Sequence, residues 1–390
     1  MKISKMKNKK RKICVVVASR ANYGRVKHLM FAIKKNENLQ LQIILGASAL
    51  LYKYGNVVDV IRSDGFRPDY EINYLLDGEN LITQAKSTGI GIIELSSAFA
   101  KLKPDIVVTV ADRFETMATA IAASYMNIPL AHIQGGEVSG NIDDSVRHAI
   151  TKLSHIHFPA TQKSKDRLIK LGEEDWRIFN YGCPSIDIIA EMDLSLPRQS
   201  FFEKKGTGIF FNPSEPYILI LQHPVTTSYG MGKKQMIETL EAVKKIKINK
   251  LVLWPNADAG SNEVSKVIRD FYNQNSSLPF SYFINFTPEV FVKLIANSKC
   301  LVGNSSSFIR EGAYLGTPAV IIGDRQIGRE HGENVIYSNY DRNEIFGKIK
   351  KQIENGSFRK SFLFGKGDAG LKISKKLETI ELKIHKEMTY

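Results

Sequence analysis

The chain has 390 residues, 43% of them hydrophobic and 24% charged, which excludes a disordered polymer and predicts two globular domains. No apolar run approaches the roughly 20 residues of a membrane-spanning helix, so we expect no membrane partner. The net charge of +14 favours an anionic ligand, but the lysines are spread out and no nucleic-acid motif accompanies them, so we expect a small phosphorylated substrate and no nucleic acid.

The first twelve residues carry six lysines and one arginine. The apolar run that follows, 13–18, is shorter than the core of a signal peptide, which needs about 7–15 residues, so we interpret residues 1–12 as a solvated basic tail. Cys14, Cys183 and Cys300 lie far apart without metal-like spacing, which indicates a reduced, cytoplasmic protein.

Short β-rich runs alternate with helical patterns along the chain, which is typical of parallel α/β architecture. In the first half the predicted strands are 13–18, 41–45, 105–110, 129–133, 155–159 and 177–181, and the predicted helices are 22–35, 80–102, 115–126 and 143–153. After a predicted linker over 193–216, the strands are 217–222, 250–254, 281–284, 300–302 and 318–322, and the helices are 234–245, 263–274, 288–297 and 307–315. Two Rossmann-like, doubly wound domains with a cleft between them result, and ligands of such sheets bind outside the carboxyl ends of the strands.

Polar side chains follow three predicted strands of the first half, where they would share one rim if the strands are neighbours. They are Arg20, the pair Asp112 and Arg113, and the pair Gln134 and Glu137. Asp112 has an alternative role as N-cap of the next helix, but the adjacent arginine and the other polar strand ends favour function.

The segment 132–152, H-I-Q-G-G-E-V-S-G-N-I-D-D-S-V-R-H-A-I-T-K, is unusually rich in ionisable groups. Asp143 and Asp144 open a predicted helix, where carboxylates also stabilise the helix dipole, and Asp143 could form a local ion pair with Arg147. The spacing supports the functional and the structural interpretation equally. His148 is slightly better explained as a surface or packed histidine.

Strand ends in the second half are also polar, at His223, at Asn256 and at the run G-N-S-S-S over 303–307. Glycine and hydroxyl residues at a helix N-terminus form an anion site, whereas an ordinary cap explains only one of the serines. Glu311, one turn later, can accept hydrogen bonds from sugar hydroxyls or be a solvated helix residue, and Arg325 adds a cation. Because no Walker loop and no G-x-G-x-x-G is present, a nucleoside triphosphatase or dinucleotide enzyme is not expected.

From residue 12 to at least 340 the chain resembles the hydrolysing UDP-N-acetylglucosamine 2-epimerases that feed sialic-acid synthesis. The motifs that carry the resemblance are S-R-A-N-Y-G at 19–24, K-P-D-I-V-V at 103–108, A-D-R-F-E at 111–115, G-G-E-V-S-G-N-I-D-D-S-V-R-H-A-I-T-K-L at 135–153, Y-G-C-P-S at 181–185, L-Q-H-P-V-T-T at 221–227, N-A-D-A-G-S at 256–261, G-N-S-S-S at 303–307 and G-D-R-Q-I-G-R-E-H-G-E-N at 323–334. The resemblance implies a GT-B fold, with a catalytic domain over 1–195, a UDP-binding domain over 196–370 and a C-terminal helix over 371–390 that packs back on the first domain.

The resemblance also implies a reaction: UDP is eliminated across carbons 1 and 2, and water then adds to the 2-acetamidoglucal to give N-acetylmannosamine. Elimination needs a base at carbon 2 and electrostatic help at the leaving phosphate. It further implies a homo-oligomer, dimer or tetramer, that works without cofactor or metal.

Matching positions assign acid and base roles to Asp112 and Asp143. The residues expected to hold UDP or substrate are Arg20, Gly24, Arg113, Arg147, His148, His223, Asn256, Ser305, Ser306, Glu311 and Arg325.

One position departs from the pattern: many relatives have a catalytic glutamate where this chain has Gln134. An amide cannot accept a proton as a carboxylate does, so the transfer would fall to Asp112, Asp143 or Glu137, with Gln134 donating a hydrogen bond to the substrate. The departure leaves two alternatives open: a UDP- or GDP-linked 2,4-diacetamido-2,4,6-trideoxyhexose of legionaminic-acid synthesis as substrate, or a catalytically weak UDP-sugar-binding regulator.

Overall fold

A computed structural model describes residues 10–78, 80–140, 142–203 and 205–389. Residues 1–9 of the basic tail expected over 1–12 lie outside the described residues. The first strand begins at Arg11, within the range predicted for the tail. Within the described residues, every helix is too short or too polar to cross a bilayer.

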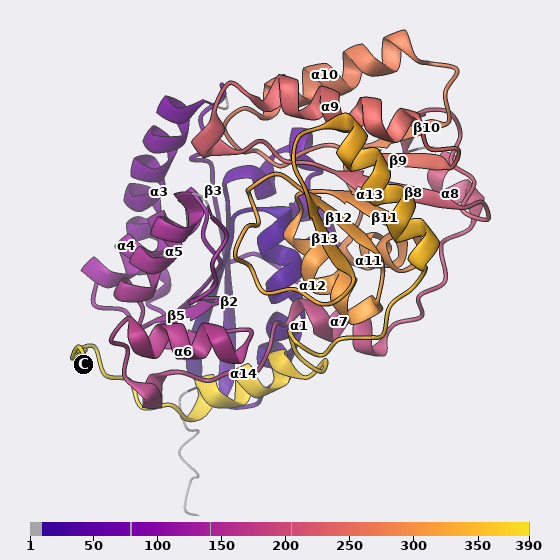
Figure 1. The fold of residues 1–390 in the computed structure, drawn as a ribbon. Helices are drawn as coiled ribbons and strands as arrows, with labels where there is room; N and C mark the ends of the chain where they lie inside the picture. The colour runs from indigo at the N-terminus through magenta and orange to yellow at the C-terminus, as the bar shows by residue number, and fades with distance from the viewer. Residues whose placement is uncertain (1–9, 79, 141, 204, 390) are drawn as a thin grey trace, which may run out of the picture.

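Two parallel sheets lie side by side, each in a domain of its own (Figure 1). The first has the order β3-β2-β1-β4-β5-β6, built from β1 (Arg11–Val17), β2 (Leu39–Gly46), β3 (Tyr70–Ile72), β4 (Ile106–Val110), β5 (Leu130–Ile133) and β6 (Ile156–Phe158). The second has the order β13-β12-β11-β8-β9-β10-β7, built from β7 (Gly206–Gly208), β8 (Tyr217–Leu221), β9 (Asn249–Leu253), β10 (Phe280–Phe283), β11 (Cys300–Gly303), β12 (Ala319–Ile322) and β13 (Val335–Ser338). Only β7 pairs antiparallel among these described strands, with β10.

The period-two alternation of β1 divides the first domain into two cores. Ile13, Val15 and Val17 face the cluster that contains α1 and α14, whereas Cys14 and Val16 face α3, α4 and α5. The helices of this half are α1 (Arg20–Lys35), α2 (Val57–Ser63), α3 (Leu81–Leu102), α4 (Phe114–Tyr125), α5 (Ile142–Leu153), α6 (Gln162–Lys170) and α7 (Ser185–Glu191).

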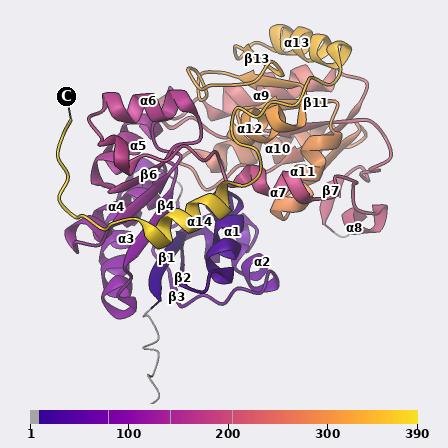
Figure 2. The same cartoon turned by 90° about the horizontal axis from the view of Figure 1, so that it is seen from below.

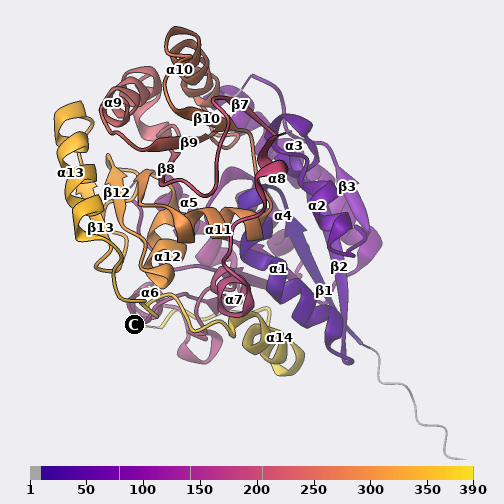
Figure 3. The same cartoon turned by 90° about the vertical axis from the view of Figure 1, so that its right-hand side faces the viewer.

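The second sheet is covered in the same way on both faces (Figure 3). Ile218 and Ile220 of β8 pack under α9, α10 and α13, whereas Leu219 and Leu221 pack with α11 and α12. The helices are α8 (Gln199–Glu203), α9 (Gly232–Lys244), α10 (Ser261–Gln274), α11 (Pro288–Asn297), α12 (Ser306–Leu315), α13 (Arg342–Asn355) and α14 (Ala369–Thr379).

The chain returns to the first domain after the second is complete (Figure 2). Ile373 and Leu377 of α14 join the core beneath α1. The segment 380–389 then runs along this domain, where Lys386 Nζ donates to the carbonyls of Lys152 (3.1 Å) and Ser154 (2.5 Å) at the end of α5. The C-terminal segment thus packs on the first domain, on the other side of the boundary expected between residues 195 and 196. The position of that boundary stays a prediction.

Three predictions differ from the structure, and two strands were not predicted. The strand expected at 177–181 is absent: Arg177 turns toward Glu174 and the tail carbonyls of Lys383 and His385, so that only Ile178 bridges to β6. The linker expected at 193–216 contains α8 and β7, because Phe202 is buried in the second core. The helix expected over 371–390 spans Ala369–Thr379, and the described residues beyond it have no regular structure. The short strands β3 and β13 were not expected.

Candidate active site

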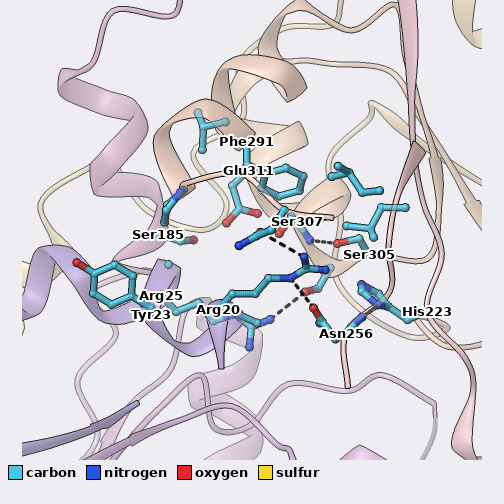
Figure 4. Close-up of a pocket in the computed structure, with 18 of the residues that line it drawn as sticks. Arg20, Tyr23, Arg25, Ser185, His223, Asn256, Phe291, Ser305, Ser307 and Glu311 are labelled. Atoms are coloured by element: carbon cyan, nitrogen blue, oxygen red, sulfur yellow. Dashed lines mark hydrogen bonds between the residues drawn. The ribbon is translucent and has the colours of Figure 1, made fainter. Parts of the chain in front are cut away.

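An open cavity lies between the domains, at the carboxyl ends of β1, β4, β8, β9 and β11. The space between its walls is about 1270 Å³, including the part that is open to solvent. Figure 4 shows Arg20 and Arg25 reaching across it from α1, with Ser305, Ser307 and Glu311 on the opposite wall. We call the side formed by the first domain the first wall and the side formed by the second domain the second wall.

Arg20, at the first position of α1, joins the two walls. Its guanidinium donates to Asn256 Oδ1 (2.7 Å), to the carbonyls of Trp254 and Ile284 (2.9 Å each) and to Asn285 Oδ1 (3.2 Å). Most of its donors are thus engaged by the second domain, so Arg20 fixes the relative position of the walls as well as lining the cavity.

The second wall presents the N-terminus of α12. Ser305 caps this helix, and Arg25 Nη2 donates to Ser306 Oγ at 2.9 Å. Gly303 precedes the cap with φ +138°, and a Cβ there would lie 2.1 Å from the carbonyl oxygen of Leu221, so only glycine fits. The start of a helix, with its dipole, and an arginine together form an anion site.

His223 extends the second wall as a neutral hydrogen-bond donor. Its Nδ1 accepts from the backbone N–H of Asn256 at 3.1 Å, which leaves the ring proton on Nε2. Burial and the nearby Arg325 and Arg20 hold the pKa of His223 well below its usual value.

Asp112 belongs to a buried network on the first wall. Arg147 pairs with Asp112 and Asp144 and donates to Ser139 Oγ (2.9 Å) and to the carbonyl of Glu137 (2.8 Å). Burial alone would raise the pKa of Asp112, but the surrounding guanidiniums lower it below its usual range. Asp112 is therefore an anion held in place, and the cap of α4 is Arg113 instead.

Asp143, at the start of α5, lines the same cavity in a different electrostatic setting. Burial and the charge of Asp112 raise the pKa of Asp143 to about 6. Two carboxyl groups in one cavity thus have pKa values shifted in opposite directions, an arrangement typical of acid–base sites.

Arg113 is engaged by a second ion-pair network. It contacts Glu115 on its own helix (2.7 Å) and Asp258 of the second domain (2.7 Å). Like Arg20, it holds the walls together where it was expected to hold the ligand, although it also lines the cavity.

Glu137 forms a third contact between the domains. Arg310 of α12 pairs with its Oε2, and Arg329 Nη1 lies 2.7 Å from the same oxygen. Burial would raise the pKa of Glu137, but the two arginines lower it, so the carboxylate remains charged.

The structure brings together most of the residues expected at the site. Those that line the cavity are Arg20, Gly24, Asp112, Arg113, Asp143, His223, Asn256, Ser305, Ser306, Glu311 and Arg325. Four are not among the lining residues: Gln134, Glu137 and Arg147, which are buried, and His148, which is partly exposed. Gln134 Nε2 donates to Cys183 Sγ at 2.8 Å, so the expected hydrogen bond from Gln134 to the substrate has no support in this geometry.

Several lining residues were not expected, among them Arg25, Ser139, Ser185 and Arg329. Arg25 directly follows Gly24, the last residue of one motif, and Arg329 lies four residues after Arg325 in another. These two motifs could have indicated Arg25 and Arg329 as site residues. In the described part of the chain, no group of three His, Cys, Asp or Glu residues could hold a metal ion.

Comparisons with known proteins agree with this architecture. A family model described as UDP-N-acetylglucosamine 2-epimerase matches residues 31–378. The chain is 33% identical over 372 residues to the hydrolysing UDP-N,N'-diacetylbacillosamine 2-epimerase of Legionella pneumophila, over 95% of this chain and 97% of that protein. It is 34% identical to the hydrolysing GDP/UDP-N,N'-diacetylbacillosamine 2-epimerase of Campylobacter jejuni, over 88% of each.

The fold is shared with the crystal structure of a UDP-GlcNAc 2-epimerase from Neisseria meningitidis bound to UDP-GlcNAc. The TM-score is 0.77 at 20% identity, over 94% of this chain and 99% of that one. The GT-B arrangement of two parallel-sheet domains that the sequence predicted is confirmed.

Proposed function

The chain belongs to the UDP-N-acetylglucosamine 2-epimerase family and is a nucleotide-sugar 2-epimerase of the hydrolysing branch; from that premise we propose that it converts a UDP-linked 2-acetamido sugar and water to the free 2-epimer and UDP. The observation that carries this proposal is the pair Asp112 and Asp143, which line one cavity with opposite pKa shifts and face the anion site of α12.

We assign the abstraction of the proton from carbon 2 to Asp143. A carboxyl with a pKa near 6 is a stronger base than an ordinary aspartate, yet it is mostly ionised at neutral pH. Asp112, held anionic by Arg147, can stabilise the cationic character that develops at carbon 1. In the hydration step a water adds its hydroxyl to carbon 1 and a proton to carbon 2, on the face opposite to the one from which Asp143 took the first proton.

The second wall provides the nucleotide site. Ser305, Ser306 and Arg325 surround the start of α12, where the diphosphate gains from the helix dipole, and Glu311 can accept hydrogen bonds from ribose hydroxyls. The neutral His223 donates through Nε2 without adding a charge.

Two sugars are candidates. UDP-N-acetylglucosamine follows from the family, and UDP-N,N'-diacetylbacillosamine, a 2,4-diacetamido-2,4,6-trideoxyhexose, is favoured by the names of the two relatives at 33% and 34% identity. Gln134 no longer argues for a protein that binds without turnover, because its amide lies behind the cavity surface.

Incubating the purified protein separately with the two donors, in water and in D₂O, and following products by NMR tests the proposal. Release of UDP with the 2-epimer, carrying deuterium at carbon 2, is the expected result for the true donor. Binding of both donors without release of UDP from either would overturn the proposed reaction.

A further inference from the structure

We propose that Arg329 is a further substrate-binding residue, one that contacts the diphosphate of the nucleotide sugar, and that Glu137 is its positioning residue. The inference rests on the proposed UDP-sugar site. It also replaces the acid–base role that Glu137 was expected to share.

Arg329 follows β12 and lines the cavity that Asp112, Asp143 and Ser139 also line. The side chain is buried, and its guanidinium is held from one side by Glu137 Oε2, 2.7 Å from Nη1. The buried Nε groups of Arg329 and Arg310 both have no hydrogen-bond partner among the residues that the structure describes, but only Arg329 of the two lines the cavity. A guanidinium that lines a cavity and is fixed from behind by a carboxylate is prepared to bind an acceptor from the ligand.

Glu137 itself is turned away from the cavity. One of its oxygens receives both Arg310 and Arg329, and its residue is 4% exposed. A carboxylate held by two arginines behind the cavity surface cannot reach a carbon-bound proton of the substrate, but it fixes the direction of both guanidinium groups.

The charge balance indicates an anion as the ligand of Arg329. Four guanidiniums, those of Arg25, Arg147, Arg310 and Arg329, surround the carboxylates of Asp112, Glu137 and Asp144, so positive charge is in excess in this cluster. Arg329 lines the cavity, whereas Arg310 does not. A buried charge is costly unless it is paired, and the diphosphate is the anionic part of a UDP-sugar. Arg325 of the same loop, four residues earlier, also lines the cavity.

The test measures the affinities of UDP, UMP and the UDP-sugars by calorimetry in the full-length protein. The variants are Arg329→Gln and the matched control Arg310→Gln, which removes an arginine from the same carboxylate but not from the cavity wall. We expect Arg329→Gln to weaken UDP binding at least about tenfold, the loss of a charge-assisted hydrogen bond, and UMP binding less than about threefold. Arg310→Gln should change UDP affinity less than about threefold.

Two results would overturn the assignment. Equal losses in both variants would mean that the arginines only hold the domains together, and a loss confined to UDP-sugars, with UDP unaffected, would mean that Arg329 contacts the sugar. If Arg329→Gln does not fold, Arg329→Lys serves the same comparison, because an ammonium keeps the charge but cannot reproduce the planar geometry.

Glu137→Gln tests the positioning role. We expect it to weaken UDP binding less than Arg329→Gln does, to leave the pH profile of turnover unchanged, and to add no further loss in the double variant Glu137→Gln/Arg329→Gln. Loss of one limb of the pH profile would instead make Glu137 a proton carrier. UDP binding can be measured without turnover. A wild-type protein that binds UDP but converts neither donor would therefore contradict the proposed reaction, and the affinities of the variants for UDP would still test the role of Arg329.

Discussion

The two walls of the cavity offer a nucleotide sugar different kinds of interaction. On the first wall, side-chain charges dominate: Asp112 is enclosed by arginines, and Asp143 lies in the first turn of α5. On the second wall, the backbone contributes as well: the start of α12, its cap Ser305 and the close approach at Gly303 form a site for an anion, and Arg325 and Arg329 line the same cavity.

The difference between the walls assigns proton transfer to the first wall and binding of the diphosphate to the second. Carboxylates whose pKa values diverge can move protons, but each charge depends on its neighbours and is sensitive to replacement. A helix N-terminus offers fixed dipoles that need no protonation state, so it can hold a diphosphate throughout the reaction. We therefore expect variants of the first wall to affect turnover and variants of the second wall to affect affinity.

The largest effect is expected for Asp143→Asn on the first wall. An amide cannot take the proton from carbon 2, so kcat should fall by about 10³-fold, whereas the affinity for UDP should stay within about threefold. Release of UDP followed by NMR, together with calorimetry, measures both quantities. A variant with near-normal turnover would remove Asp143 from catalysis and weaken the contrast between the walls.

Gly303→Ala is the corresponding change on the second wall. The new Cβ would meet the carbonyl of Leu221 at 2.1 Å and displace the start of α12, so UDP affinity should fall at least about tenfold with a loss of stability of about 1–3 kcal/mol. Gly230→Ala is the control, because Gly230 also has a positive φ (+87°) but a Cβ there would meet open space. Equal UDP affinities in the two variants would argue against the anion site.

The pH dependence sharpens the role of Asp143. If the ionised form is the base, kcat/KM should decline below the pKa of about 6, by about tenfold for each further pH unit. The free energy of unfolding changes with pH in the opposite direction to kcat/KM. The raised pKa of Asp143 contributes stability that is fully present below the unfolded pKa of 3.8 and is lost as the pH rises through about 6.

Asp143→Asn should therefore be more stable than the wild type at pH 7.5, by on the order of 3 kcal/mol, with the difference shrinking toward pH 4. Urea unfolding across this range measures the difference. A variant that is less stable at pH 7.5 would mean that the carboxylate is stabilised by its surroundings.

The smallest effect is expected for Gln134→Ala, behind the first wall. Because Gln134 donates to Cys183 and does not line the cavity, turnover and substrate KM should change less than about threefold, while the melting temperature falls. A large loss of kcat at unchanged stability would restore Gln134 to the reaction and require the cavity to rearrange when substrate binds.

Most of the cavity could be predicted from the sequence because its residues directly follow apolar strands. Asp112 follows β4 and Ser305 follows β11, and neighbouring parallel strands bring such ends together. The strand expected at 177–181 did not form, because Arg177 pairs with Glu174 and only Ile178 of the segment bridges to β6.

The interdomain ion pairs could not be predicted. Glu137 and Arg329 are 192 residues apart, and no local pattern links a carboxylate after β5 to an arginine after β12. Asp144 was predicted only as an acidic helix start, yet it receives the N–H groups of Ser139 and Gly140 as well as Arg147. The pair of Glu137 with Arg329 depends on how two separately folded sheets meet, and the partners of Asp144 depend on the path of the loop between β5 and α5.

The tail over 380–389 has a consequence for synthesis of the protein. Lys386 donates to carbonyls at the end of α5, the helix whose first turn contains Asp143, and α14 covers the core beneath α1. Both segments are synthesised only after the entire second domain. The first domain, although it is translated first, is therefore completed last, and a nascent chain interrupted before residue 369 would expose Leu29 and Ile33 to whatever chaperone is near.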